Sequence, residues 1–209
     1  MEEKEIYIFD LGGVLIQLDV NRCMRAFGTL MGEQNMRQIL GMDSRGEGVK
    51  AVSVASKQLM ADFEKGLIST EQFIHEVLQY CRPGTTAQEV KDAWMAMLDE
   101  LPKERLDFID SLRAKGHKTY LLSNGNDLHF DFINATYGLD AHFDALFLSQ
   151  KMHLSKPENA IYEAVQKTIH GDGKRIIFID DIESNRLAAE RAVHWRTLPS
   201  LEALKAQQR

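Results

Sequence analysis

The sequence predicts an α/β fold, a doubly wound parallel sheet interrupted by an inserted all-helical segment. Short, continuous apolar runs alternate with helical patterns, which is typical of strands buried on both faces of a parallel sheet. Residues 17–101 break this alternation, because they contain helical patterns and no convincing strand. We therefore expect a sheet domain of residues 1–16 and 102–209 and a helical domain of residues 17–101.

Each expected strand is a short apolar run that ends in turn-forming residues. The first run is rich in β-branched and aromatic side chains, and Gly12 and Gly13 follow it. A second run ends at Asn124 and Gly125 in the same way. The expected strands are residues 6–10, 119–123, 145–149, 176–180 and, with a weaker pattern, 193–197.

Helical patterns separate these runs. One helix is expected between Pro102 and Gly116, where apolar residues recur at the spacing of one helix face. Two similar patterns occur farther along the chain. The positions that define the three patterns are Leu106, Ile109 and Leu112; Ile161, Ala164, Val165 and Thr168; and Leu187, Ala188 and Arg191.

The inserted segment carries its own helix signals. Ser69–Gln72 and Thr86–Glu89 have the spacing of capping boxes at helix N-termini. Apolar stripes follow both boxes, and we interpret them as the core of the insertion rather than as a ligand site. The stripes are Phe73, Ile74, Val77 and Leu78, then Val90, Trp94 and Met97.

Composition and charge indicate an ordinary globular protein of 209 residues, of which 44% are hydrophobic. No apolar run approaches the roughly 20 residues that span a membrane, and the acidic start MEEKEIYIF does not resemble a signal peptide. The net charge of −6 disfavours nucleic acid as a partner. Cys23 and Cys81 give no disulfide framework, which fits the cytoplasm. The oligomeric state cannot be predicted.

Polar side chains stand where the expected strands end. In an open parallel sheet, ligands bind beyond the carboxyl ends of the strands, so residues at these ends should meet at one rim. Three acids, a hydroxyl and a lysine at one rim indicate chemistry rather than turn formation alone. These residues are Asp10, Ser123 with Asn124, Asp180 with Asp181, and Lys156 shortly after the third strand.

This set of residues suits phosphoryl transfer. Asp10 can attack phosphorus and form an aspartyl-phosphate, which divides hydrolysis into two easier steps. Two anions approach each other only if their charge is neutralised. Asp10 and Asp181, with a backbone carbonyl, supply the oxygen ligands that Mg²⁺ requires, and Asp180 would act through a water molecule.

The remaining rim residues are expected to bind the phosphate. Ser123 and the backbone N–H of Asn124 can donate hydrogen bonds to the transferring oxygens, and Lys156 adds a positive charge beside the nucleophile. Gly12 and Gly13 allow the backbone to approach the phosphate closely.

Four motifs resemble those of the haloacid dehalogenase (HAD) superfamily of hydrolases: FDLGGVL, LLSN, the lysine of SKPENAIY, and FIDDIESN. The position of the insertion resembles the C1 cap of subfamily I, above a Rossmann-like core. The motifs look most similar to sugar-phosphate phosphatases of the alpha-D-glucose-1-phosphate phosphatase type. This resemblance implies Mg²⁺-dependent hydrolysis of small phosphate monoesters, with sugar phosphates favoured and a small phosphorylated metabolite as the partner.

Gly12 departs from the commonest pattern of this family. Most of its phosphatases carry an aspartate there, which protonates the leaving oxygen, activates water and offers its backbone carbonyl to Mg²⁺. Gly12 has no acidic side chain, so of these groups it could offer only its backbone carbonyl to Mg²⁺. Candidate replacements for the acid are Asp19, His129, Asp43 and Glu47, although His129 fits an exposed helix position better.

Gly12 also leaves two alternative functions open. Haloacid dehalogenases lack that aspartate too and need no metal, but the adjacent acids Asp180 and Asp181 would repel each other without a cation. Leu11 with Gly12 also differs from the small residue and tyrosine usual in those enzymes. The other alternative is a phosphometabolite-binding module with little turnover.

The cap suggested by the resemblance would close over the site and exclude water. The polar loop Gly41–Gly48 is the candidate segment that faces the site, where Arg45 would contact a substrate hydroxyl or a second anionic group. An ordinary solvated connection between helices explains this loop equally well. The hinges of the cap are expected near residues 16–18 and 101–102.

Overall fold

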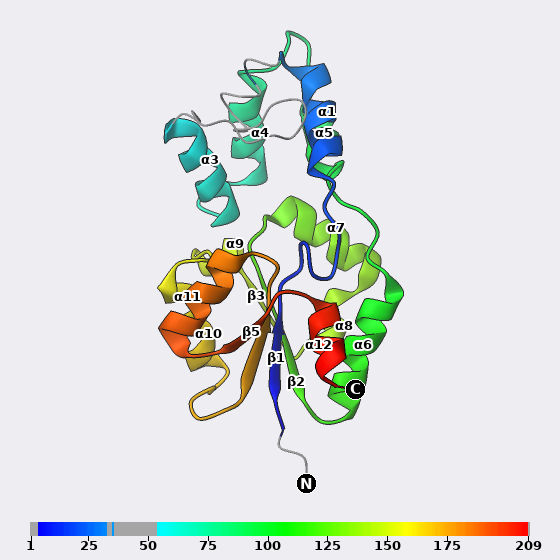
Figure 1. Cartoon of the computed structure of the whole chain (residues 1–209). Helices are drawn as coiled ribbons and strands as arrows, with labels where there is room; N and C mark the ends of the chain where they lie inside the picture. The colour runs from blue at the N-terminus through cyan, green and yellow to red at the C-terminus, as the bar shows by residue number, and fades with distance from the viewer. Residues whose placement is uncertain (1–3, 33–34, 36–53, 209) are drawn as a thin grey trace.

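The computed structural model describes residues 4–32, 35 and 54–208. The described strands form a five-stranded parallel sheet in the order β3-β2-β1-β4-β5, with β1 at its centre (Figure 1). Strand order reverses on either side of β1, so the predicted doubly wound α/β class is confirmed. The strands are β1 Ile6–Phe9, β2 Lys118–Ser123, β3 Ala145–Leu148, β4 Ile176–Ile179 and β5 Arg196–Leu198.

Helices cover both faces of the sheet (Figure 1). Tyr7 and Phe9 point to one face, where they join a core with α6, α7, α8 and α12, and Ile6 and Ile8 point to the other, where they meet α10 and α11. Burial on both faces explains why the strands are continuous apolar runs. The helices are α6 Lys103–Ala114, α7 Asp127–Tyr137, α8 Leu139–His142, α9 Ser149–Met152, α10 Asn159–Thr168, α11 Glu183–Val193 and α12 Leu201–Gln207.

Two details of the C-terminal third differ from expectation. The fifth strand begins at Arg196, because α11 continues to Val193 and His194 ends that helix in the left-handed conformation at φ 55°. The predicted apolar face of α11 is also wrong at Leu187, which is 45% exposed. The buried side of α11 consists of small and polar residues, Asn185, Ala188 and Ala189.

The described part of the inserted segment folds into helices beyond the carboxyl ends of the strands (Figure 1). We call α1 Val20–Leu30, α3 Val54–Glu64, α4 Thr70–Leu78 and α5 Ala87–Met95 the helical insertion. Both predicted capping boxes are present at α4 and α5. Its core is aromatic: the rings of Phe63 and Phe73 stack 4.1 Å apart, and Trp94 packs against both.

The chain enters and leaves the helical insertion through two segments that pair with each other. Leu18 and Leu98 form an antiparallel bridge. The N–H of Asp19 donates to the carbonyl of Met97 at 2.8 Å, and Arg22 donates to the carbonyl of Leu98 at 2.6 Å. The two connections therefore form one short ribbon close to the predicted hinges.

Two further expectations concerned membrane-spanning segments and disulfides. Within the described residues, no helix combines the length and hydrophobicity needed to cross a bilayer. Cys23 is buried, Cys81 is half-buried, and both are free thiols, which agrees with the absence of a predicted disulfide framework.

Candidate active site

Two acids follow neighbouring strands at the centre of the sheet. Phe9 pairs with Ile179, so Asp10 and Asp180 leave the ends of β1 and β4 side by side. The N–H of Asp10 donates to the carbonyl of Ile179 at 2.8 Å, which continues the strand pairing to the site. Asp10 is 6% exposed and Asp180 is fully buried. Parallel pairing thus places two carboxylates in a desolvated position, as predicted from the strand ends.

Lys156 joins these two acids. Its Nζ lies 2.9 Å from Asp10 Oδ1 and 2.6 Å from Asp180 Oδ2, and it also donates to the carbonyl of Leu122 at 3.0 Å. Burial alone would lower the pKa of Lys156, but the carboxylates of Asp10 and Asp180 raise it above its ordinary value. The ammonium therefore remains charged and offsets part of the repulsion between the two acids.

The segment that carries Lys156 is held by the end of β2. The side chain of Asn124 accepts a hydrogen bond from the N–H of Lys156 and donates one to its carbonyl, both at 2.9 Å. Ser123 is buried at the same strand end, and its hydroxyl contacts the carbonyl of Asn124 at 3.3 Å. Asn124 therefore positions Lys156 with its side chain, a role that the sequence motif does not predict.

The turn after β4 is fixed by a network around Asp180. Its carboxylate accepts hydrogen bonds from the N–H of Ile182 at 2.9 Å and from Asn185 Nδ2 at 3.1 Å. Arg186 donates to the carbonyls of Asp180 and Asp181 at 2.7 and 2.8 Å. Asn185 and Arg186 are positioning residues that the sequence reasoning did not single out. Their placement in the first turn of α11, directly after the paired acids, is the available signal.

The third acid, Asp181, is exposed and lies against Gly13. A Cβ built on Gly13 would lie 2.3 Å from Asp181 Oδ2, and Gly13 has φ 75°. A side chain here would be both strained and in collision, so glycine is required at this position. The expected close approach at Gly13 is therefore to Asp181 as well as to any phosphate.

The three acids have the composition of a site for a hard cation. Carboxylate oxygens of Asp10, Asp180 and Asp181 lie within 4.8 Å of one another. Burial raises the pKa of Asp10 to about 7; Lys156 opposes this rise and Asp180 adds to it. Burial, together with Asp180, also raises the pKa of Asp181. One ammonium does not neutralise three carboxylates, and an all-oxygen donor set fits Mg²⁺.

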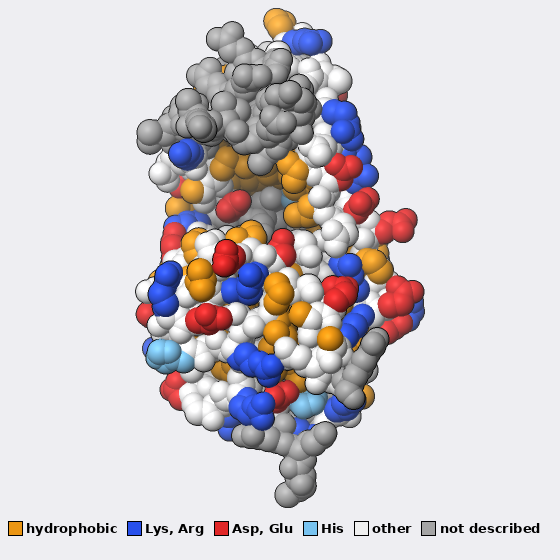
Figure 2. All heavy atoms as spheres, in the orientation of Figure 1, with side chains coloured by type: hydrophobic (Ala, Val, Ile, Leu, Met, Phe, Trp, Pro, Cys, Tyr) orange, Lys and Arg blue, Asp and Glu red, His pale blue; other side chains and the backbone are white. Residues whose placement is uncertain are grey.

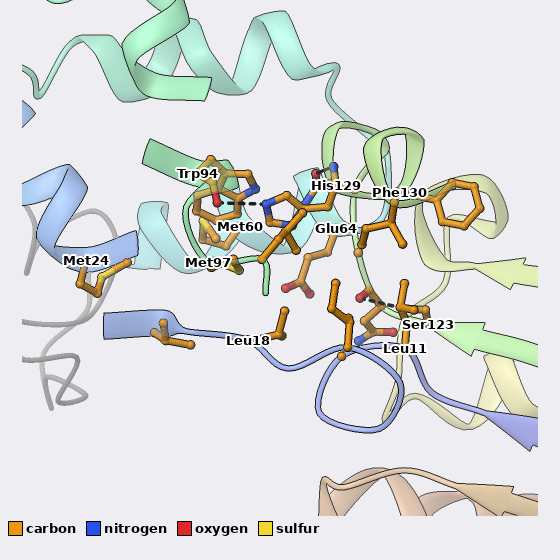
Figure 3. A pocket seen from close by; sticks show the side chains of 18 residues that line it. Leu11, Leu18, Met24, Met60, Glu64, Trp94, Met97, Ser123, His129 and Phe130 are labelled. Atoms are coloured by element: carbon orange, nitrogen blue, oxygen red, sulfur yellow. Dashed lines mark hydrogen bonds between the residues drawn. The ribbon is translucent and has the colours of Figure 1, made fainter. Parts of the chain in front are cut away.

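A cavity of about 250 Å³ lies between this site and the helical insertion. Figure 2 shows the hollow between the two parts of the molecule, with hydrophobic side chains on its upper edge. The few polar residues that line the cavity include Glu64, Ser123 and His129 (Figure 3). Most of the other lining side chains are apolar: Leu11, Ile16, Leu18, Val20, Met24, Met60, Trp94, Met97, Leu98, Phe130 and Ile133.

Gly12 lines this cavity, and its missing side chain has an identifiable neighbour. A Cβ built on Gly12 would lie 2.8 Å from Leu18 Cδ1. Leu18 itself is 41% exposed and also lines the cavity. The apolar side chain of Leu18 thus occupies the space that the first carbon of a side chain at position 12 would need.

The expectation that His129 is an exposed helix residue is wrong. His129 is half-buried on α7, with Nε2 3.1 Å from the carbonyl of Trp94 and its ring stacked 5.6 Å from the indole. Burial lowers its pKa to about 4, so the imidazole is neutral at pH 7. The contact joins α7 of the sheet domain to α5 of the helical insertion, which a sequence pattern cannot reveal.

The other suggested acids are used elsewhere or lie outside the described residues. Asp19 caps α1 by accepting a hydrogen bond from the N–H of Arg22 at 2.8 Å. Arg45 and the loop Gly41–Gly48, with Asp43 and Glu47, lie outside the described residues. The sequence reasoning missed Glu64 at the end of α3, because one acid on a charged helix surface carries no distinguishing signal.

Trp94 combines two roles. It is a core residue of the helical insertion, as predicted, and it also lines the cavity. Its buried Nε1 has no hydrogen-bond partner within the part of the chain that the structure describes. A polar ligand atom in the cavity could satisfy this donor.

Known proteins resemble this chain over most of its length. D-ribitol-5-phosphate phosphatase from Bacteroides thetaiotaomicron is 27% identical over 184 residues, which are 85% of this chain and 83% of that protein. (S)-2-haloacid dehalogenase from Pseudomonas sp. (strain YL) is 26% identical over 186 residues, 82% of this chain and 72% of that protein. A solved HAD family enzyme from Bacteroides thetaiotaomicron, in complex with magnesium and inorganic phosphate, has a TM-score of 0.78 and 30% identity, with 93% of each chain covered.

The family model of haloacid dehalogenase-like hydrolases matches residues 4–192. This match spans β1, the helical insertion and the strand ends that carry the acids and Lys156. The resemblance of the four motifs and the predicted enzyme class, a hydrolase, are both confirmed. The chain belongs to the haloacid dehalogenase-like hydrolase family.

Proposed function

We propose that this chain is a Mg²⁺-dependent phosphatase of small phosphate monoesters that forms an aspartyl-phosphate on Asp10. The observation that carries the proposal is the rim itself, where Lys156 pairs with Asp10 and Asp180 while Asp181 lies within 4.8 Å of both acids. A site built only to bind phosphate would use cations and N–H donors and would not place a carboxylate at the point of attack.

The residues divide the work of phosphoryl transfer. Asp10 attacks phosphorus with the carboxylate oxygen that is not paired with Lys156, and Lys156 holds its orientation. Ser123 Oγ and the N–H of Asn124 donate to the phosphate oxygens, while Gly12 and Gly13 leave room for the phosphate beside the backbone. Charge that develops on the phosphate thus meets fixed donors in a site with little water.

The cation would be held by Asp10, the carbonyl of Gly12 and Asp181, with Asp180 acting through water. When bound, Mg²⁺ supplies neutralisation of charge and orientation of the phosphate. The raised pKa values of Asp10 and Asp181 support this assignment, because clustered carboxylates gain most from a cation.

Sugar or sugar-alcohol phosphates are the favoured substrate class. The similarity to D-ribitol-5-phosphate phosphatase supports this class. A cavity of about 250 Å³ suits a small leaving group, and Trp94 offers an aromatic face for C–H groups and an indole N–H for a hydroxyl. The apolar lining favours substrates in which part of the carbon chain can pack without hydroxyl contacts.

The helical insertion would serve as the cap, with residues 17–101 as the cap domain and 1–16 and 102–209 as the core. It lies over the strand ends, and the cavity is shared between the two parts. Closure over the substrate would exclude water and limit substrate size. Arg45 stays a candidate contact from the part of the cap outside the described residues.

The test is phosphate release from a panel of sugar phosphates, alditol phosphates and other monoesters, with Mg²⁺ and with EDTA, beside Asp10→Asn. We expect metal-dependent turnover that the substitution abolishes. The similarity to a haloacid dehalogenase makes 2-haloacids the comparison substrates. Halide release that persists in EDTA would overturn the proposal in favour of dehalogenation, and tight phosphate-ester binding without turnover would favour a binding module.

A further inference from the structure

Hydrolysis of an alkyl phosphate needs a proton for the departing oxygen. An alkoxide is a poor leaving group, and general acid catalysis typically contributes about 10²–10⁴-fold to such a step. Gly12 offers no side chain, and Leu18 occupies the adjacent space. The proton must therefore come from another side chain, if the chain has the proposed phosphatase function.

Three other titratable groups near the cavity are poorly suited to the task. His129 has Nε2 at the carbonyl of Trp94 and Nδ1 3.4 Å from Asn126 Nδ2, and it is neutral at pH 7. Asp19 caps α1 through its carboxylate. Lys156 is committed to two carboxylates, which hold its proton firmly.

Glu64 differs from these groups. It is the last residue of α3, and its carboxylate projects into the cavity between Trp94 on the side of the insertion and Leu11 and Ser123 on the side of the strand ends (Figure 3). Within the described part of the chain, no hydrogen bond or ion pair involves its carboxylate. It lines the same cavity as Gly12, the position that lacks an acid.

The surroundings of Glu64 favour its neutral form more than water would. Burial raises its pKa above the ordinary value for glutamate, and the charge of Lys156 opposes this rise. Because the charge of Lys156 acts on this pKa, the Glu64 carboxylate lies within electrostatic range of Lys156, which pairs with Asp10. A carboxylic acid in a largely apolar pocket is a known arrangement for proton transfer.

The end of α3 is fixed to the sheet domain, which gives Glu64 a defined position. Ser149 Oγ donates to the carbonyl of Glu64 at 2.5 Å and accepts from the N–H of Gly125 at 3.0 Å. The next turn packs on α9, since a Cβ on Gly66 would lie 2.2 Å from the carbonyl of Gln150. Main-chain anchoring of this kind holds a catalytic group more precisely than a free helix end would.

We propose that Glu64 is the general acid and base of this enzyme and replaces the side chain that Gly12 lacks. In the first step, Asp10 forms a bond to phosphorus, the bond from phosphorus to the ester oxygen breaks, and Glu64 gives its proton to that oxygen to release the alcohol. In the second step, water attacks phosphorus, Glu64 takes a proton from the water, and the bond to Asp10 breaks to release phosphate. Both residues return to their starting states.

The test compares two leaving groups in wild type and Glu64→Gln. An alkyl ester such as glycerol phosphate needs the proton, whereas 4-nitrophenyl phosphate releases a stabilised anion without it. We expect kcat/KM of Glu64→Gln to fall by about 10²–10⁴-fold for the alkyl ester and by less than about tenfold for the aryl ester. Because kcat/KM covers only the steps through formation of the phosphoenzyme, the second role of Glu64 does not obscure this comparison.

The second role has its own readout. If Glu64 activates water, kcat for the aryl ester falls in Glu64→Gln, and a burst of nitrophenol precedes steady turnover as the phosphoenzyme accumulates. Glu76→Gln is the matched control, because it makes the same side-chain change at an exposed position on α4. The control should retain wild-type rates with both esters.

Other outcomes would refute the role of Glu64. Equal losses with both esters would make it a binding residue only, and no loss would place the proton source elsewhere. If wild type releases phosphate from neither these esters nor the metabolite panel, the phosphatase proposal fails first and the role of Glu64 with it. Should Glu64→Gln not fold, Glu64→Asp places the acid farther from the ester oxygen. A larger loss with the alkyl ester than with the aryl ester would then support the proposal, and an unchanged ratio of alkyl to aryl rates would refute it.

Discussion

The pairing of Lys156 with two buried acids makes a quantitative prediction for Lys156→Met in metal-free protein. The side chains of Lys156, Asp10 and Asp180 are 1%, 9% and 0% exposed. Removal of one partner from a buried ion pair typically costs about 3–5 kcal/mol, because the remaining charge is buried without compensation. Asp10 can take up a proton, since its pKa is already raised to about 7, so we count only the charge left on Asp180.

The predicted loss can be measured by urea unfolding in EDTA. For a chain of this size, about 3–5 kcal/mol corresponds to a melting temperature lower by roughly 6–20 °C. Adding Asp180→Asn to Lys156→Met removes the stranded charge and should recover at least half of the loss, which a double-mutant cycle reports as coupling. Lys103→Met is the control, since Lys103 pairs with Asp107 on an exposed helix surface, and its unfolding midpoint should stay at the wild-type value.

Two results would refute this reasoning. If Lys156→Met unfolds at the wild-type urea concentration, as Lys103→Met should, the buried pairs contribute no stability. If the losses from Lys156→Met and Asp180→Asn simply add, the two charges are not coupled. Either result would mean that water or a rearranged side chain compensates Asp180 in the metal-free protein.

Three further predictions concern the surroundings of the site. Gly13→Ala should displace Asp181 and lower the apparent affinity for Mg²⁺, measured from thermal stabilisation, by at least about tenfold. Gly84→Ala is the control, because Gly84 has a similar strain at φ 90° but open space around its Cβ, and it should leave the Mg²⁺ affinity unchanged. Ser149→Ala removes a buried hydrogen bond to the end of α3 and should cost about 1–3 kcal/mol of unfolding free energy and lower kcat. Because burial lowers the pKa of His129 to about 4, the unfolded chain binds its proton first as pH falls below about 6.5. Stability from this group should therefore decline by about 2–3 kcal/mol between pH 6.5 and 4, and His129→Gln should remove that part of the decline measured by urea titration.

The centre of the sheet could be predicted because the burial of each strand is visible in a short stretch of sequence. Strands β1 and β4 are buried on both faces, so each is an unbroken apolar run, and the acid that ends it is conspicuous. β5 is harder to locate, because it spans three residues at the edge and only Leu198 is buried. On α11 the predicted face was Leu187, Ala188 and Arg191, of which only Ala188 is buried, because small side chains let that helix approach the sheet.

The rim could be predicted for the same reason, and the cavity could not. Asp10, Ser123 and Asp180 follow directly from strand ends, so parallel topology alone brings them together. Glu64 and His129 reach the cavity only because α3 and α5 pack against α9 and α7, and no spacing in the sequence encodes that contact. The close approach of Leu18 to Gly12 likewise depends on the path of the connecting segment.

The ribbon formed by Leu18 and Leu98 also bears on how such a chain could have evolved. Paired residues across an antiparallel bridge lie about 5 Å apart, so the polypeptide returns almost to the point from which it departed. A tight turn could therefore join residue 17 to residue 99 without rethreading any strand. We expect a chain shortened in this way to retain the central sheet. We also expect the helical insertion to be exchangeable among relatives as a unit.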